Sequence, residues 1–356
     1  MKKLWLCVLL MAFAVTVGFR IASAQAPDPT SIVKLDPGLD ELIAPDAKVE
    51  LVEPNAFQNT EGPVWVSKGK EGYLLFSDVP SNVIEKFEPG CDKAPCPIES
   101  GKVSLYLDHS GFSEEERAAG KVPYADHDGS VGLAVDLQGR IVMADPGEHS
   151  VVRVEKDGTR TTLASTYDGK RFSCPNKVLI KADGAIYFTD ASTTCLGGEN
   201  GTDRQMDYHG FFLIKDGKVT LLGKDPEGAA PHGIAMSPDQ KVLYIGSGKK
   251  VLAYDIQPDD TVANERVYLD TGTAKGGLDG ISVDMKGNVW LSGPGGIWVV
   301  SPEGKHLGTI PPPAVQGVRF ANLAFGDSDR KTLYLVGGKN LCRIRLKISG
   351  ATSSTF

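Results

Sequence analysis

The sequence predicts an all-β fold, a six-bladed β-propeller whose last blade is closed by an N-terminal strand. Six segments share one template, in which a short apolar strand, a polar turn, a second apolar strand, a loop and a third strand follow one another. These segments recur every 40 to 70 residues or so, close to the spacing of propeller blades. Glycine (41 residues) and proline (22) are frequent enough in a chain of 356 residues to supply many tight turns.

The repeats define the strands of each blade. The first strands begin near Gly62, Gly132, Lys177, Gly233, Gly280 and Asn322, and the second strands near Leu74, Ile141, Ile186, Leu243, Val289 and Leu333. A repeat of this kind buries its faces only against its neighbours. The last repeat has room for three strands, and residues 48–52, ahead of the first repeat, can supply the fourth. A β-sandwich, the competing all-β fold, would not need a regular repeat.

Composition excludes some functions. The chain is 41% hydrophobic, which is enough for a sizeable core and too much for a disordered protein. Lys and Arg number 38 against 45 Asp and Glu, a net charge of −7, and no basic run interrupts the chain. A nucleic-acid partner is therefore not expected.

The N-terminus predicts export to the periplasm or the extracellular medium. Lys2 and Lys3 precede an apolar run that ends at Phe19, and a small-x-small cleavage pattern follows at 22–24. An uncleaved transmembrane anchor is the alternative, but the run is short for one. We therefore expect a signal peptide at 1–24, an N-terminal extension at 25–46, the propeller at 47–348 and a C-terminal tail at 349–356. No membrane association is expected after cleavage, and the oligomeric state stays open.

Export makes disulfides possible. Cys91 and Cys96 flank a short proline-containing loop, which favours a bond between them over two free thiols. Cys174 and Cys195 are placed where two antiparallel neighbours reach the same face, so we predict a second disulfide, with two unpaired thiols as the alternative. Cys342 is then the free thiol.

The candidate site comes from the start of the inner strands. In a propeller these strands line the central channel and all start at the same end, so the residue before each template is delivered to one place on the axis. These residues are Glu61, Val131, Asn176, His232, Asp279 and Ala321. A single polar residue there is commonly a turn former, but four that converge need a positive charge among them. The pattern predicts one divalent metal ion bound by Glu61, Asn176, His232 and Asp279.

Four motifs around these positions resemble one family. They are NTEGPVW at 59–65, PN at 175–176 with DGAIYFTD at 183–190, PHGIAMSPD at 231–239, and LDG at 278–280. Together they resemble the gluconolactonase, senescence-marker-protein (regucalcin) and luciferin-regenerating-enzyme family over about residues 50 to 347. The resemblance implies a six-bladed propeller that hydrolyses lactones with one divalent ion on its axis, often calcium. By position it implies Glu61 as a ligand, Asn176 on the substrate or metal side, and Asp279 as ligand and base.

Two positions depart from the family pattern. His232 stands where the family has asparagine as its third ligand, and Val131 stands where bacterial members carry asparagine. Calcium prefers oxygen ligands, whereas imidazole suits zinc and other transition metals. The metal is therefore expected to be calcium by resemblance, or zinc or another transition metal because of His232.

The expected activity is metal-dependent opening of a lactone or related ester. The ion would polarise the carbonyl and activate water, with Asp279 as general base and His232 as ligand or alternative base. Asn176, Asp145, Asp190 and His127 are predicted to contact substrate, the two aspartates because they end second strands and His127 because it lies on an insertion at 108–130. No serine-hydrolase elbow, phosphate loop or dinucleotide fingerprint is present. The alternative is a non-catalytic exported propeller that binds a ligand or a partner protein.

Overall fold

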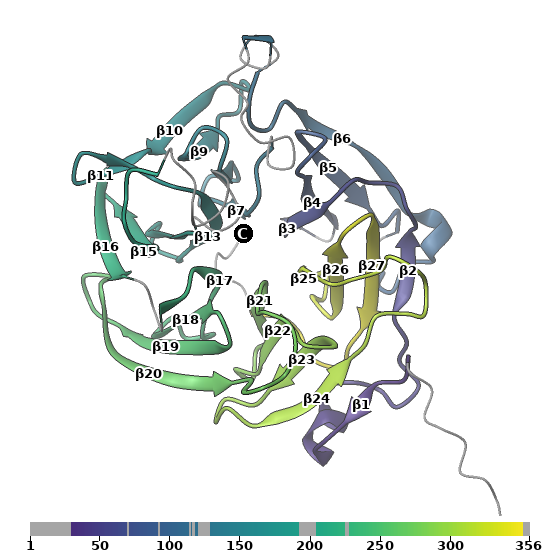
Figure 1. The fold of residues 1–356 in the computed structure, drawn as a ribbon. Helices are drawn as coiled ribbons and strands as arrows, with labels where there is room; N and C mark the ends of the chain where they lie inside the picture. Colours follow the sequence, from purple (N-terminus) through teal and green to yellow (C-terminus); the bar gives the residue numbers. More distant parts are fainter. Residues whose placement is uncertain are drawn as a thin grey trace, which may run out of the picture.

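Six antiparallel sheets surround a central axis in the computed structural model (Figure 1). The structure describes residues 30–351 apart from 70, 92, 114, 116–117, 120–128, 192–203 and 225–227. Each predicted repeat forms one sheet, and the predicted first and second strands are its two inner strands. The six-bladed propeller is thereby confirmed. Within the described residues, no helix has the length and apolar character needed to cross a membrane.

The strands fall into four concentric sets. The innermost strands are β3 (Thr60–Lys68), β7 (Leu133–Val135), β13 (Pro175–Ile180), β17 (Pro231–Met236), β21 (Ile281–Val283) and β25 (Asn322–Gly326). The second strands are β4 (Glu71–Asp78), β8 (Ile141–Asp145), β14 (Ile186–Asp190), β18 (Val242–Ser247), β22 (Val289–Gly293) and β26 (Thr332–Gly337). The third strands are β5 (Val83–Glu88), β9 (Ser150–Val154), β15 (Gly210–Lys215), β19 (Lys250–Ile256), β23 (Gly296–Val300) and β27 (Asn340–Arg345). The fourth strands are β6 (Lys102–Asp108), β10 (Arg160–Ala164), β16 (Lys218–Lys224), β20 (Val262–Asp270), β24 (His306–Ile310) and β2 (Glu50–Glu53).

The core lies between neighbouring blades. Second strands are the most deeply buried, and Leu74, Leu75 and Phe76 of β4 are fully inaccessible. Between the first and last blades, Trp65 stacks on Tyr334 with ring centroids 5.8 Å apart. Burial of each such side chain contributes roughly 1.5–3 kcal/mol, and no blade could gain it alone because each face needs its neighbour.

Ring closure follows the predicted route. Strand β2 pairs antiparallel with β27 and completes the sixth blade from the N-terminal side of the chain. The extension ahead of it is more ordered than its sequence indicated. Strand β1 (Val33–Lys34) adds a fifth strand to the fifth blade beside β24, and the 3-10 helix η1 (Pro37–Glu41) follows it. Leu39, Leu42 and Ile43 pack into the core of blades five and six.

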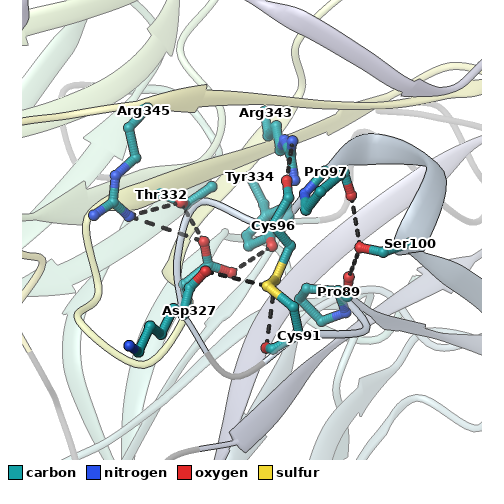
Figure 2. The surroundings of a disulfide bond; sticks show 11 residues. Pro89, Cys91, Cys96, Pro97, Ser100, Asp327, Thr332, Tyr334, Arg343 and Arg345 are labelled. Atoms are coloured by element: carbon teal, nitrogen blue, oxygen red, sulfur yellow. Dashed lines mark hydrogen bonds and ion pairs between the residues drawn. A yellow bond between two sulfur atoms is a disulfide. The ribbon is translucent and has the colours of Figure 1, made fainter.

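A disulfide-bonded loop braces the ring closure from the first blade. Cys91 and Cys96 form the predicted disulfide, with their Cα atoms 5.6 Å apart. The loop runs into the 3-10 helix η2 (Ile98–Ser100). Figure 2 shows Arg343 of β27 donating to the Cys96 carbonyl, at 2.7 Å, and the same guanidinium donates to Glu50 of β2. The loop thus joins blade one to both strands that meet at the seam.

The other cysteines agree with the prediction as far as the structure describes them. Cys342 is a buried free thiol. Cys174 takes part in a disulfide. Its predicted partner Cys195 lies outside the described residues, so the pairing stays a prediction. Two further short strands, β11 (Thr166–Tyr167) and β12 (Lys170–Arg171), form a hairpin ahead of Cys174.

Candidate functional site

Three innermost strands break register at the predicted axial residues. Pairing with the second strand shifts between Glu61 and Val64, between Pro175 and Val178, and between Pro231 and Ile234. A bulge of this kind re-aims the side chains that it carries. Glu61, Asn176 and His232 lie at these breaks, and Asp279 lies just before β21. The four predicted residues therefore share one end of the central channel.

Glycine at the next position permits this arrangement. The innermost strands approach so closely that a Cβ on Gly233 would lie 2.1 Å from the Asp279 carbonyl oxygen. The amide of Gly132 donates to the Asn176 carbonyl at 2.9 Å, which joins two neighbouring blades at the axis. The repeated glycine in the sequence template is thus a packing requirement of the ring.

Blade three places a lysine where four blades have glycine, and the sequence analysis missed it. Lys177 is 6% exposed, and its Nζ lies 2.9 Å from Glu61 Oε2 and 3.3 Å from Asp279 Oδ1. We call Glu61, Asn176, Lys177, His232 and Asp279 the axial cluster. The signal in the sequence is a charged residue at a template position that is glycine in four blades and asparagine in the sixth.

Neighbouring side chains hold the axial cluster in place. Asn322, the other residue that replaces the template glycine, donates to Glu61 Oε2 at 3.3 Å. Thr189 accepts from the Lys177 amide at 3.1 Å and donates to the His232 carbonyl at 3.0 Å. One hydroxyl thereby couples the third and fourth innermost strands.

Burial and charge set the protonation states. Burial opposes the charges of Glu61 and Lys177, but their attraction outweighs it, so the pKa of Glu61 is lowered and that of Lys177 is raised. Burial raises the pKa of Asp279 to about 6 against the attraction of Lys177. Burial, then the charge of Lys177, lowers the pKa of His232 to about 4. At neutral pH the cluster therefore holds two carboxylates, one ammonium and a neutral imidazole.

Solvent accessibility divides the axial cluster into a buried part, which we call the floor, and a partly exposed part at the opening of the channel, which we call the mouth. Glu61, Asn176 and Lys177 are buried, whereas His232 is partly exposed and the Asp279 side chain is 31% exposed. Asp279 and His232 are thus the members that a ligand at the mouth can reach. The Asn176 Oδ1 atom is buried and has no hydrogen-bond partner among the described residues.

A second cation has a weak electrostatic effect on the axial cluster. Arg319 is exposed and donates to Asn59 Oδ1 at 2.6 Å. Its positive charge makes a small contribution that favours the ionised forms of both Glu61 and Asp279. Sequence analysis missed Arg319 because it precedes the sixth inner strand in a loop without any motif.

The axial cluster does not fit a divalent metal ion as it stands. The described residues contain no group of three His, Cys, Asp or Glu side chains arranged to hold a metal. Glu61 and Asp279 do converge, but each turns an oxygen to the Lys177 ammonium. The ammonium thus satisfies the charge requirement from which the sequence analysis predicted a metal.

The aspartates that end second strands have structural roles. Asp190 is fully buried and accepts from the amides of Ser173 and Cys174, just before Asn176. Asp145 is also fully buried and accepts from the Glu148 amide at 3.1 Å. These positions do not support the prediction that Asp145 and Asp190 contact substrate, because both carboxylates are closed to solvent. Both oxygens of Asp190 and one oxygen of Asp145 accept from backbone amides, and the other oxygen of Asp145 has no hydrogen-bond partner among the described residues. His127 lies outside the described residues.

Asp145 gives a prediction about stability and pH. Burial raises its pKa from 3.8 to about 7, so the folded protein binds this proton more tightly than the unfolded chain does. This contribution to the free energy of unfolding is fully present below about pH 4 and is lost as pH rises through 7. At pH 8 the buried charge costs ~4 kcal/mol, and an asparagine amide without an acceptor would cost about 1–3 kcal/mol.

Asp145→Asn should therefore stabilise the protein by ~1–3 kcal/mol at pH 8 and lose this advantage at pH 5. Urea unfolding at the two pH values measures the difference. Asp207→Asn is the control, because the Asp207 side chain is 81% exposed. Equal stability differences at both pH values would contradict the prediction.

Comparison with known proteins agrees with the fold. Residues 59–338 match the model of the SMP-30/Gluconolactonase/LRE-like region. A gluconolactonase of Zymomonas mobilis is 31% identical over 90% of this chain and 87% of its own length. The fold is similar to a gluconolactonase structure from Xanthomonas campestris (TM-score 0.72, 24% identity, 89% of this chain and 95% of that one). It is also similar to regucalcin, a calcium-binding protein, from Agrobacterium tumefaciens (TM-score 0.61, 16% identity, 86% and 95%).

Proposed function

Because this chain belongs to the SMP-30/gluconolactonase/LRE-like family, we propose that it hydrolyses a lactone at the axial cluster. The observation that carries the proposal is the placement of Asp279 and His232. Both are partly open to solvent, and the ion pair of Lys177 with Glu61 and Asp279 fixes the Asp279 carboxylate on the axis. The similarity to a gluconolactonase over most of both chains supports a lactone as the substrate.

The chemistry follows from the protonation states. The ionised Asp279 carboxylate accepts a proton from water, and the water oxygen attacks the lactone carbonyl carbon. The ring C–O bond then breaks, and the proton passes from Asp279 to the departing ring oxygen. The product is an open hydroxy acid, whose new carboxylic acid group ionises at neutral pH and releases one proton to solvent. His232, neutral at neutral pH, can accept a hydrogen bond from the water or from a substrate hydroxyl.

The family resemblance also implies one divalent ion, which we do not assign a step. The carboxylate oxygens that would bind it are in contact with Lys177. The residues proposed to act on the substrate are therefore Asp279 and His232. Glu61 and Lys177 form the floor that positions Asp279.

We also propose that the mature protein acts outside the cytoplasm. Support comes from the N-terminal pattern of Lys2, Lys3, an apolar run and a small-x-small site. The Cys91–Cys96 disulfide is consistent with an oxidising compartment. Substrate would then be a small lactone that reaches the enzyme in the periplasm or the medium.

The test is a panel of lactones assayed with the purified protein. Glucono-1,5-lactone, an aliphatic γ-lactone and an aromatic lactone are incubated with enzyme, and proton release is followed at fixed pH. We expect at least one lactone to open faster than its spontaneous hydrolysis, with saturation kinetics. Binding of a lactone without hydrolysis would instead favour a ligand-binding propeller. If the protein neither binds nor hydrolyses any lactone of the panel, the proposal is overturned.

A further inference from the structure

Lys177 is built into the axis rather than placed at its edge. Four of the six blades have glycine at the equivalent position, where neighbouring innermost strands nearly touch. In blade three the lysine side chain instead crosses to the first blade. It reaches Glu61, 116 residues earlier in the chain, and is almost as inaccessible to solvent as the core.

The ammonium bridges the two carboxylates on the axis. One oxygen of Glu61 lies 2.9 Å from Nζ and one oxygen of Asp279 lies 3.3 Å from it. A calcium ion shared by the same two oxygens would have to lie about 2.3–2.6 Å from each. It would then compete with the ammonium for the same lone pairs, and the two positive charges would repel each other in a site of low effective dielectric constant.

The charge balance of the axial cluster also disfavours a bound divalent ion. Without Lys177, Glu61 and Asp279 would form a buried pair of like charges that needs a cation. With Lys177 the three groups sum to one negative charge, and the buried carboxylate Glu61 has two protein donors, Lys177 and Asn322. The cation that the site needs is thus supplied by the chain itself.

We propose that the Lys177 ammonium takes the place of the divalent ion on the axis, so that the protein holds no stoichiometric metal at the axial cluster. Lys177 is then a positioning residue that fixes Glu61 and Asp279. The inference goes beyond the proposed function, because it concerns what occupies the floor of the site and holds whether or not a lactone is the substrate.

The experiment measures metal binding rather than activity. Wild-type protein, Lys177→Gln and Lys177→Arg are dialysed against calcium, zinc or manganese and then against metal-free buffer. Bound metal is counted by mass spectrometry, and the melting temperature is followed as each metal is added. Lys86→Gln is the matched control, because it removes an ammonium from a surface ion pair with Glu88 at 3.0 Å.

We expect wild type, Lys177→Arg and Lys86→Gln to retain far less than one ion per chain and to melt at the same temperature with and without metal. Lys177→Gln should bind about one ion, and its melting temperature should rise with metal concentration. One tightly held ion per chain in the wild type would overturn the proposal. So would a folded Lys177→Gln variant that binds no metal. If Lys177→Gln does not fold, the metal content of the wild type decides.

Discussion

Asp279→Asn is expected to reduce lactone hydrolysis by about 10²–10⁴-fold, the usual effect of removing a general base. Asparagine keeps the shape of the side chain but cannot accept a proton from water. The loss should appear in kcat, because the substrate still meets His232. Steady-state kinetics on the best lactone of the panel measures it, and circular dichroism checks that the variant is folded.

The control for Asp279→Asn is Asp207→Asn, the same chemical change at a carboxylate that is 81% exposed. It should leave kcat and KM unchanged. Wild-type kcat in a folded Asp279→Asn variant would show that Asp279 is not the base. In that case His232→Ala becomes the deciding variant, since His232 is the other group open to the mouth.

Gly62→Ala is expected to destabilise the propeller by ~3 kcal/mol. Gly62 has a φ of +53°, and a Cβ there would lie 1.9 Å from the Val131 carbonyl oxygen. That contact is with backbone, so the first two innermost strands would have to separate. Because Gly62 follows Glu61 at the register break, the change should also disturb the ion pair with Lys177. Urea unfolding measures the loss of stability.

Gly69→Ala separates the two causes of that loss, which are backbone strain at a positive φ and the clash of the new Cβ with the neighbouring strand. Gly69 has a φ of +62°, close to that of Gly62, but a Cβ there would meet nothing within 4 Å. This variant carries the backbone strain alone and should lose only ~1 kcal/mol. Equal losses in the two variants would show that the close approach of the innermost strands contributes nothing.

The propeller could be predicted because its information is local and repeated. Each pair of apolar strands appears as a short hydrophobic run around a polar turn, and six copies make the pattern unambiguous. The closing strand, predicted at 48–52 and found at Glu50–Glu53, could also be predicted, because the sixth repeat lacked a fourth strand. Strand β1 escaped prediction because it is two residues long and adds to a blade that is already complete.

Only part of the candidate site could be predicted from the sequence. The axial positions of Glu61, Asn176, His232 and Asp279 followed from the repeat register, since equivalent positions of a closed ring must converge. The roles of Asp145 and Asp190 did not follow. Asp145 accepts from the amide of Glu148 in the turn that follows it, and Asp190 accepts from Ser173 in the segment before its blade, so the role of each depends on how the flanking loop folds.

Strand periodicity and repeat spacing specify the ring, its closure and the convergence of four polar residues, so these features could be predicted from the amino-acid order. The charge that lies among the four residues could not, because it depends on contacts between distant blades. Lys177 follows Asn176 in the chain, but its ammonium meets a carboxylate 116 residues earlier and another in the fifth blade. A long flexible side chain can reach several partners, and its choice is made by the distances between strands that only the folded ring brings together.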